Sequence, residues 1–156
     1  MKLAQLSFVC LMFVGLACDD KNEKDQSAAT AKIVEVENRA INGQQWRITN
    51  YTESNVDQTA SFNGYIFEFD SNNLLTVTNG SDNIAGTWSV VADNSDDDND
   101  SKSEFDDIDF NLMFTNPEMF AELTEDWEIL SINDTKIELR HSSDNGRLDL
   151  LTFERI

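Results

Sequence analysis

The residues of this chain that could bind a metal ion lie in an acidic stretch between positions 93 and 104. Asp93, Asp97 and Glu104 occupy the first, fifth and twelfth positions of a calcium-loop spacing, and carboxylates supply the oxygen ligands that Ca²⁺ prefers. The sixth position is Asp98, whereas such loops need a glycine there for their sharp turn. Runs of like charge are usually solvated. A solvent-exposed loop is therefore the favoured interpretation, and a weak calcium site is the alternative.

His141 is the single histidine, and the chain offers it few chemical companions. A zinc site needs further ligands, and a serine hydrolase needs a nucleophile in a Gly-any-Ser-any-Gly turn, which is absent from the sequence. The neighbours Glu125 and Asp126 could serve glycoside hydrolysis, but such pairs are expected by chance among 30 acidic residues. The sequence thus predicts a surface histidine near a turn, no cofactor and no enzymatic activity.

Cys18 follows a segment that has the layout of an export signal. Lys2 gives a positive start, an apolar run extends over residues 8–16, and a small residue stands directly before the cysteine. An apolar run of this length is too short for a permanent transmembrane helix. We therefore predict a signal peptide over residues 1–17 and lipidation of Cys18. Cys10 would leave with the signal peptide, so no disulfide is expected in the folded domain.

The composition limits the partners that the protein can have. The chain carries 11 basic and 30 acidic residues, for a formal net charge of −19. Such a surface repels phosphate backbones and anionic lipid headgroups, which disfavours nucleic-acid binding and electrostatic membrane docking. Residues 18–30 are mostly small and polar, and we expect them to form a flexible tether between the lipid anchor and a single folded domain over residues 31–156.

From position 46 onward, apolar and polar residues alternate at a period of two, which is typical of half-buried strands. In the clearest run, every second residue from Ile108 to Phe114 is apolar. Short turns between the runs favour an antiparallel meander, and a meander has exposed edges unless it closes. We predict a mostly β fold, an eight-stranded barrel with strands at 46–52, 62–70, 74–78, 84–91, 107–115, 127–132, 136–141 and 148–155.

Two helices are expected beside the strands. Ile33, Val36 and Ala40 recur at helical spacing, which predicts a short N-terminal helix over residues 31–41. Met119, Phe120 and Leu123 give one apolar face to a short helix near 117–124. That helix is suited to covering an open end of the barrel.

Several stretches of the predicted barrel carry a resemblance to a known family, namely 62–67, 86–90, 114–117, 125–127, 136–139 and 151–155. Through them the chain, from about Gly43 to Ile156, resembles the lipocalin-like domain of many small lipoproteins of Gram-negative bacteria. The resemblance implies a small antiparallel barrel with an N-terminal helix, in which Arg155 of the last strand is the basic partner of Trp46. It also implies a multiply acylated Cys18 (palmitate among its acyl chains) and attachment to the outer membrane. Acidic residues just behind Cys18 are similar to an address for display on the cell surface.

The large aromatic side chains of the predicted barrel form either a filled core or the lining of a small ligand cavity. The filled core is favoured, because side chains nearly consume an eight-stranded interior. The residues concerned are Tyr65, Phe67, Phe69, Trp88, Phe110, Phe114 and Trp127. We therefore expect a non-enzymatic, lipid-anchored envelope protein that acts as a binding or surface-interaction module for an unidentified partner. The alternatives are a carrier of a small apolar ligand inside the barrel and a calcium-dependent interaction protein.

Overall fold

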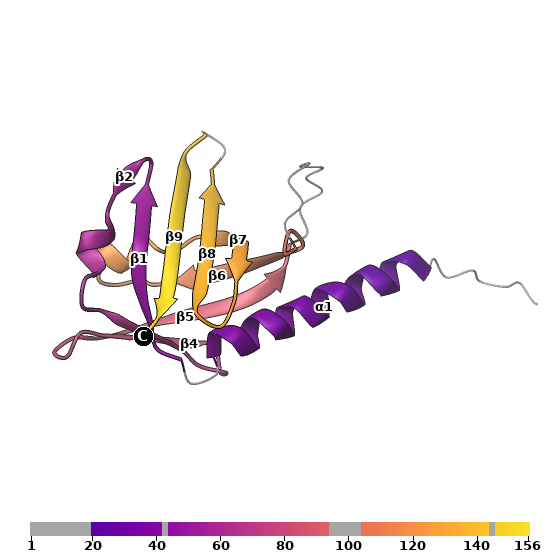
Figure 1. Cartoon of the computed structure of the whole chain (residues 1–156), viewed down its shortest axis with the longest axis horizontal. Coiled ribbons are helices and arrows are strands. Elements are labelled where there is room, and N and C mark those ends of the chain that lie inside the picture. Colours follow the sequence, from indigo (N-terminus) through magenta and orange to yellow (C-terminus); the bar gives the residue numbers. More distant parts are fainter. Residues whose placement is uncertain (1–19, 42–43, 94–103, 144–145) are drawn as a thin grey trace, which may run out of the picture.

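An eight-stranded antiparallel barrel forms the body of the computed structural model, which describes residues 20–41, 44–93, 104–143 and 146–156 (Figure 1). Consecutive barrel strands pair with one another, and the last strand pairs with the first, which closes the sheet. The prediction of a closed meander is confirmed. The barrel strands are β1 (Trp46–Glu53), β3 (Ile66–Phe69), β4 (Leu74–Thr78), β5 (Asn83–Ala92), β6 (Ile108–Met113), β7 (Asp126–Ile132), β8 (Lys136–Ser142) and β9 (Leu148–Arg155).

The segment between β1 and β3 differs from the prediction. A two-residue strand, β2 (Val56–Asp57), pairs with the end of β1, and a 3₁₀-helix, η1 (Thr59–Phe62), follows it. The predicted strand over 62–70 was therefore too long at its start. Gly64 has a φ of +84°, outside the extended region, so the chain becomes a strand only from Ile66.

Trp46 lies where the barrel closes. It is the Cα partner of Arg155 on β9 and of Phe67 on β3, and the latter is the one residue pair recorded between β1 and β3. Its side chain is fully buried, and the indole Nε1 donates a hydrogen bond to the carbonyl oxygen of Ala40, 3.0 Å away. The first strand, the last strand and the N-terminal helix are thus joined at one residue.

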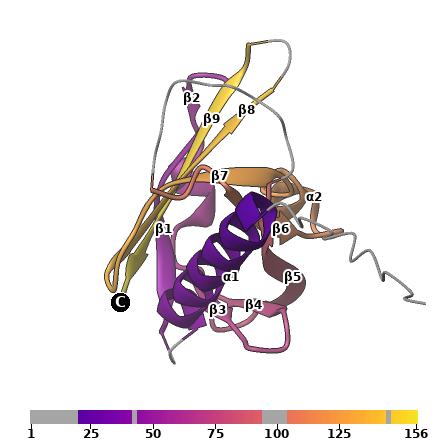
Figure 2. The ribbon, with the colours of Figure 1, turned by 90° about the vertical axis from the view of Figure 1, so that its right-hand side faces the viewer.

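Helix α1 (Asp20–Ile41) lies across the barrel end where β1 and β6 begin (Figures 1 and 2). Val36 and Ala40 are fully buried in the core, which confirms the predicted apolar face. At the edges of the contact, Lys32 forms an ion pair with Asp107, and Arg39 donates to the carbonyl oxygen of Ile132. The helix therefore closes this end with an apolar centre and basic flanks. It is not long and apolar enough to cross a membrane, and neither is α2, the other α-helix of the described part of the chain.

Helix α1 is longer than predicted. It begins at Asp20 and so includes residues 20–30, which were expected to form a flexible tether. The alanines at 28, 29 and 31 are the strongest helix formers, and Glu35 forms an ion pair with Arg39 one turn later. Local helix propensity thus extends the helix past the turns that pack on the barrel.

The opposite end of the barrel is covered by η1 and by the short helix α2 (Glu118–Ala121), which lies within the predicted range 117–124. Phe120 of α2 is fully buried, and its ring contacts the rings of Phe62, Tyr65, Phe67 and Phe114 at centroid distances of 5.1–6.1 Å. An aromatic cluster therefore seals much of this end. The strands β1, β8 and β9 extend beyond it (Figure 1).

Candidate functional site

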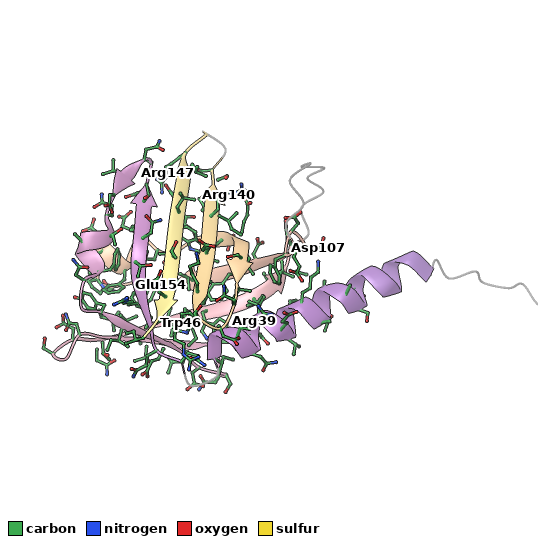
Figure 3. The ribbon with its side chains drawn as sticks, viewed as in Figure 1. Arg39, Trp46, Asp107, Arg140, Arg147 and Glu154 are labelled. Atoms are coloured by element: carbon green, nitrogen blue, oxygen red, sulfur yellow. The ribbon has the colours of Figure 1, made fainter. Side chains whose placement is uncertain are left out.

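Five ionisable side chains converge where β1, β8 and β9 extend past the aromatic cluster. We call this set, Glu53, Glu125, His141, Arg147 and Asp149, the Arg147 cluster. Figure 3 shows Arg147 beside the upper parts of β1 and β9, at the other end of the barrel from Trp46 and Arg39. The positions follow from strand alternation, since His141 lies two residues beyond buried Leu139, and Asp149 two residues before buried Leu151. The polar groups thus continue the inward faces of the barrel.

Asp149 is the most buried member of the Arg147 cluster, with 1% of its surface exposed. Its Oδ2 accepts hydrogen bonds from Nε and Nη2 of Arg147 at 2.9 and 2.8 Å. The hydrogen bond to Asp149 also raises the pKa of the Arg147 guanidinium above its ordinary value. The ion pair and these hydrogen bonds compensate for the burial of the carboxylate.

The second oxygen of Asp149 holds the turn between β1 and β2. Oδ1 accepts a hydrogen bond of 2.8 Å from the backbone N–H of Ser54. Ser54 and Asn55 have φ values of 50° and 67°, the pair of left-handed residues that a type I′ hairpin turn requires. Such a conformation is unfavourable for serine, so the buried carboxylate stabilises a backbone that the local sequence disfavours.

Glu53 and Glu125 complete the cluster around the same guanidinium. Their carboxylates lie 3.5 and 3.9 Å from Nη2 of Arg147. His141 adds an imidazole whose Nε2 lies 3.6 Å from Glu125, while its Nδ1 lies 3.1 Å from the carbonyl oxygen of Asp126. His141 lies near the end of β8 as predicted, with 20% of its side chain exposed, and its ring packs edge-on against Trp127.

The chemistry open to the Arg147 cluster is recognition by charge. Three carboxylates surround one guanidinium and one imidazole, which gives the cluster an excess of negative charge. The hydroxyl of nearby Ser143 donates to the carbonyl oxygen of Arg147, at 3.4 Å.

Tyr51 is a buried neighbour of the Arg147 cluster. Its side chain is buried, and its hydroxyl donates to the carbonyl oxygen of Glu122, 3.0 Å away. Burial raises the pKa of the Tyr51 phenol well above its usual range, and the negative charges of Glu53 and Asp149 add to the effect. The phenol therefore stays protonated and acts as a hydrogen-bond donor that ties β1 to the chain after α2.

Most of the aromatic residues singled out in the sequence line the barrel interior, where their rings contact one another or further aromatic rings. Six of the seven, namely Phe67, Phe69, Trp88, Phe110, Phe114 and Trp127, are buried. The ring of Phe69 alone contacts the rings of Trp88, Phe110 and Phe153, at centroid distances of 5.2–5.7 Å. Tyr65 is half-buried at the rim, and its hydroxyl donates to Asp82.

The remaining candidate residues fall partly outside the described part of the chain. Cys18 and Asp97 lie outside it. Asp93, at the end of β5, is half-buried and donates its backbone N–H to the carbonyl oxygen of Asp107, and Glu104 is exposed. Among the residues with described positions, no three histidine, cysteine, aspartate or glutamate side chains come together in a way that could hold a metal ion.

Glu53, Arg147 and Asp149 were not predicted as site residues from the sequence. A signal for two of them exists in and just before the last strand, where Arg147 and Asp149 continue the period-two series of buried Leu151 and Phe153. Two charged residues of opposite sign on an inward face predict a buried ion pair. Glu53 offers no such signal, because it joins the cluster only through the closure of β1 on β9.

Comparison with models of protein families, with curated proteins and with solved structures gave no match for this chain.

Proposed function

We propose that this protein is a lipid-anchored protein of the bacterial outer membrane whose barrel is a non-enzymatic binding module. It would be exported by the signal in residues 1–17, anchored through acylated Cys18, and would meet its partner with the outside of the barrel. The observation that carries the proposal is the packing of the interior. Rings that contact one another from wall to wall favour recognition at the surface over transport of a ligand inside.

The distribution of polar groups agrees with this proposal. The interior is aromatic and aliphatic, whereas ionisable groups gather in the Arg147 cluster, beyond the aromatic cluster, and on the outer wall. Side chains of Arg147 and Glu125 are about one third exposed, so a partner can reach them. Charged groups at accessible positions contribute to the rate and specificity of association.

The anchor is tested by labelling cells with an alkyne fatty acid. We expect the wild-type protein and a Cys10→Ser variant to take up the label, because Cys10 lies inside the predicted signal. A Cys18→Ser variant should lose the label and appear in the soluble fraction. Full labelling of the Cys18→Ser variant would contradict the anchor.

The binding mode is tested by native mass spectrometry of protein purified from membranes without denaturation. We expect the mass of the acylated chain with no small molecule retained, and tryptophan fluorescence that does not change on addition of oleate. A stoichiometric apolar molecule, or a saturable fluorescence change, would instead support the carrier of a small apolar ligand. Cross-linking in intact cells should then identify a protein neighbour of the wild-type chain but not of the Cys18→Ser variant.

A further inference from the structure

The outer wall of the barrel carries a groove that shares Glu125 with the Arg147 cluster and otherwise lies beside it. The groove has a volume of about 440 Å³, which falls within the range of ligand-binding sites, and it crosses β5, β6 and the start of β7. We call it the Asn111 groove. Among the side chains that line it are Thr87, Ser89, Asn111, Met113, Glu125 and Asp126.

The strand register arranges the outward side chains of this wall in rows. Leu74, Thr87 and Met113 form one row across three strands, and Ser89, Asn111 and Asp126 form the next. Met113 is 60% exposed and Leu74 is 39% exposed, so the first row is largely apolar and open to solvent. Two residues along a strand span about 7 Å, which sets the distance between the apolar row and the polar row.

Asn111 lies at the centre of the polar row. Its Oδ1 atom is buried and accepts no hydrogen bond from any residue that the structure describes. A buried acceptor without a hydrogen bond lowers the stability of the fold, and a ligand that donates a hydrogen bond to it would remove this penalty. Because rotation about χ2 of asparagine is soft, a small turn of the amide brings the oxygen to the groove.

Carboxylates lie on the β7 side of the groove, where Glu125 and Asp126 line it. Asp126 is exposed and forms no ion pair within the described part of the chain. Two residues before Asn111, Asp109 has its pKa raised to about 6 by burial and by the nearby carboxylates of Asp93, Asp126 and Glu128. Glu128 is paired with Arg140, so a cation that reaches Asp126 from the groove would relieve the part of this repulsion that Arg140 does not.

We propose that the Asn111 groove binds an extended basic segment of a protein partner. An apolar side chain of that segment lies over Met113, and the Lys or Arg two residues further along donates to Asn111 and Asp126. An extended chain presents alternate side chains on one face about 7 Å apart, which matches the spacing of the two rows. The aliphatic stem of a Lys or Arg side chain can also lie along apolar surface, so it would add to the cover over the exposed Met113.

This inference rests on the proposed binding function and specifies its partner. The probe is the capped peptide Leu-Ser-Arg-Ser-Leu-Ser-Arg, titrated by calorimetry into the full chain in neutral detergent micelles. The control peptide carries citrulline in place of arginine, which keeps the shape and removes the charge. We expect saturable binding of the arginine peptide that weakens as salt is raised, and clearly weaker binding of the citrulline peptide.

Three variants locate the site. Asp126→Asn and Met113→Ser should each weaken binding of the arginine peptide about fivefold, the size expected for one exposed charge or one partly buried apolar contact. Asp134→Asn removes the same charge in the β7–β8 turn, outside the groove, and should leave the affinity unchanged within twofold. Asn111→Leu should weaken binding without lowering the denaturation midpoint, because it removes an acceptor that the fold leaves unpaired.

The outcomes separate the groove from the general binding function. If the arginine peptide binds and Asp126→Asn, Met113→Ser and Asp134→Asn bind it equally well, the groove assignment is overturned while a binding surface elsewhere remains. If acetylated arginine amide binds as tightly as the peptide, the extended segment is wrong. If none of these probes binds, the groove has no such ligand, and the cross-linking result still decides whether the protein has a partner.

Discussion

The backbone N–H of Ser54 donates a hydrogen bond of 2.8 Å to Oδ1 of Asp149, a residue 95 positions later in the chain. The same carboxylate binds Arg147 through its other oxygen. One buried side chain of the last strand therefore fixes the turn that ends the first strand. This contact and the closure of β1 on β9 are parts of one arrangement.

Replacing Asp149 by alanine should lower the free energy of unfolding by about 2 kcal/mol. The variant leaves the Arg147 guanidinium without its principal partner and the N–H of Ser54 without an acceptor, although Arg147 keeps some contact with solvent. Urea denaturation followed by circular dichroism measures the change. Asp134→Ala, in an exposed turn, is the matched control and should change the stability by less than about 0.5 kcal/mol. Equal stability of the two variants would contradict the role of Asp149.

The ionised Asp109 carboxylate should destabilise the fold at neutral pH. Its pKa is about 6 in the folded protein against 3.8 in the unfolded reference. The folded state therefore binds the proton more tightly, and the free energy of unfolding falls as pH rises from about 4 to 6. Asp109→Asn should raise stability by about 1 kcal/mol at pH 7, a value reduced for the solvent screening of a half-buried group.

The same variant should give no advantage well below the unfolded-state pKa of 3.8, where the wild-type carboxyl is protonated in both states. Denaturation curves at low pH, about one unit below that value, and at pH 7 measure this difference, with Asp134→Asn as the control for a lost surface charge. A stabilisation by Asp109→Asn that is equal at both pH values would show that ionisation is not its cause.

Gly86 should tolerate no side chain. A Cβ atom there would lie 2.6 Å from the Phe114 ring and 2.8 Å from the carbonyl oxygen of Met113. We expect Gly86→Ala to cost about 2–3 kcal/mol through overpacking of the barrel wall. Gly80→Ala is the control, because its Cβ meets nothing within 4 Å and only the left-handed backbone at φ +87° opposes it, at about 1 kcal/mol. Thermal denaturation ranks the two, and a smaller effect at Gly86 would refute the close contact.

Trp46 should control the attachment of α1. Trp46→Phe removes the hydrogen bond to the Ala40 carbonyl, so amide hydrogen exchange should increase in residues 33–41. Trp127→Phe is the matched change, because its Nε1 donates to the carbonyl oxygen of Leu123 and not to α1. That variant should increase exchange near residues 118–124 and leave α1 unchanged. Identical exchange patterns in the two variants would contradict the assignment.

Local patterning was sufficient to predict most strands of this barrel. The alternation in residues 107–115 identifies β6, and the runs at 74–78 and 148–155 coincide with β4 and β9. The error at Phe62 has a local cause, since an aromatic side chain can face the core from a 3₁₀ turn as well as from a strand. The periodicity of apolar residues predicts which side chains face inward, but it does not distinguish a strand from a 3₁₀ turn.

The contacts within the Arg147 cluster could not be predicted from the sequence. Glu125 and His141 were each recognised in the sequence as residues that could do chemistry. Their approach to 3.6 Å, however, depends on the register of β7 with β8. The burial of Asp149 depends in turn on the pairing of β9 with β1. No short-range pattern encodes those pairings, because each is set by the closure of the whole sheet.

Helix α1 projects from the barrel on one side (Figure 1). Val36 is fully buried in the core, and the helix begins 16 residues earlier, at Asp20, so this part of its backbone spans about 24 Å at the usual helical rise. The helix lies across the end of the barrel opposite the Arg147 cluster (Figures 1 and 3). A protein that binds at that cluster would therefore approach the barrel from the side that α1 leaves free.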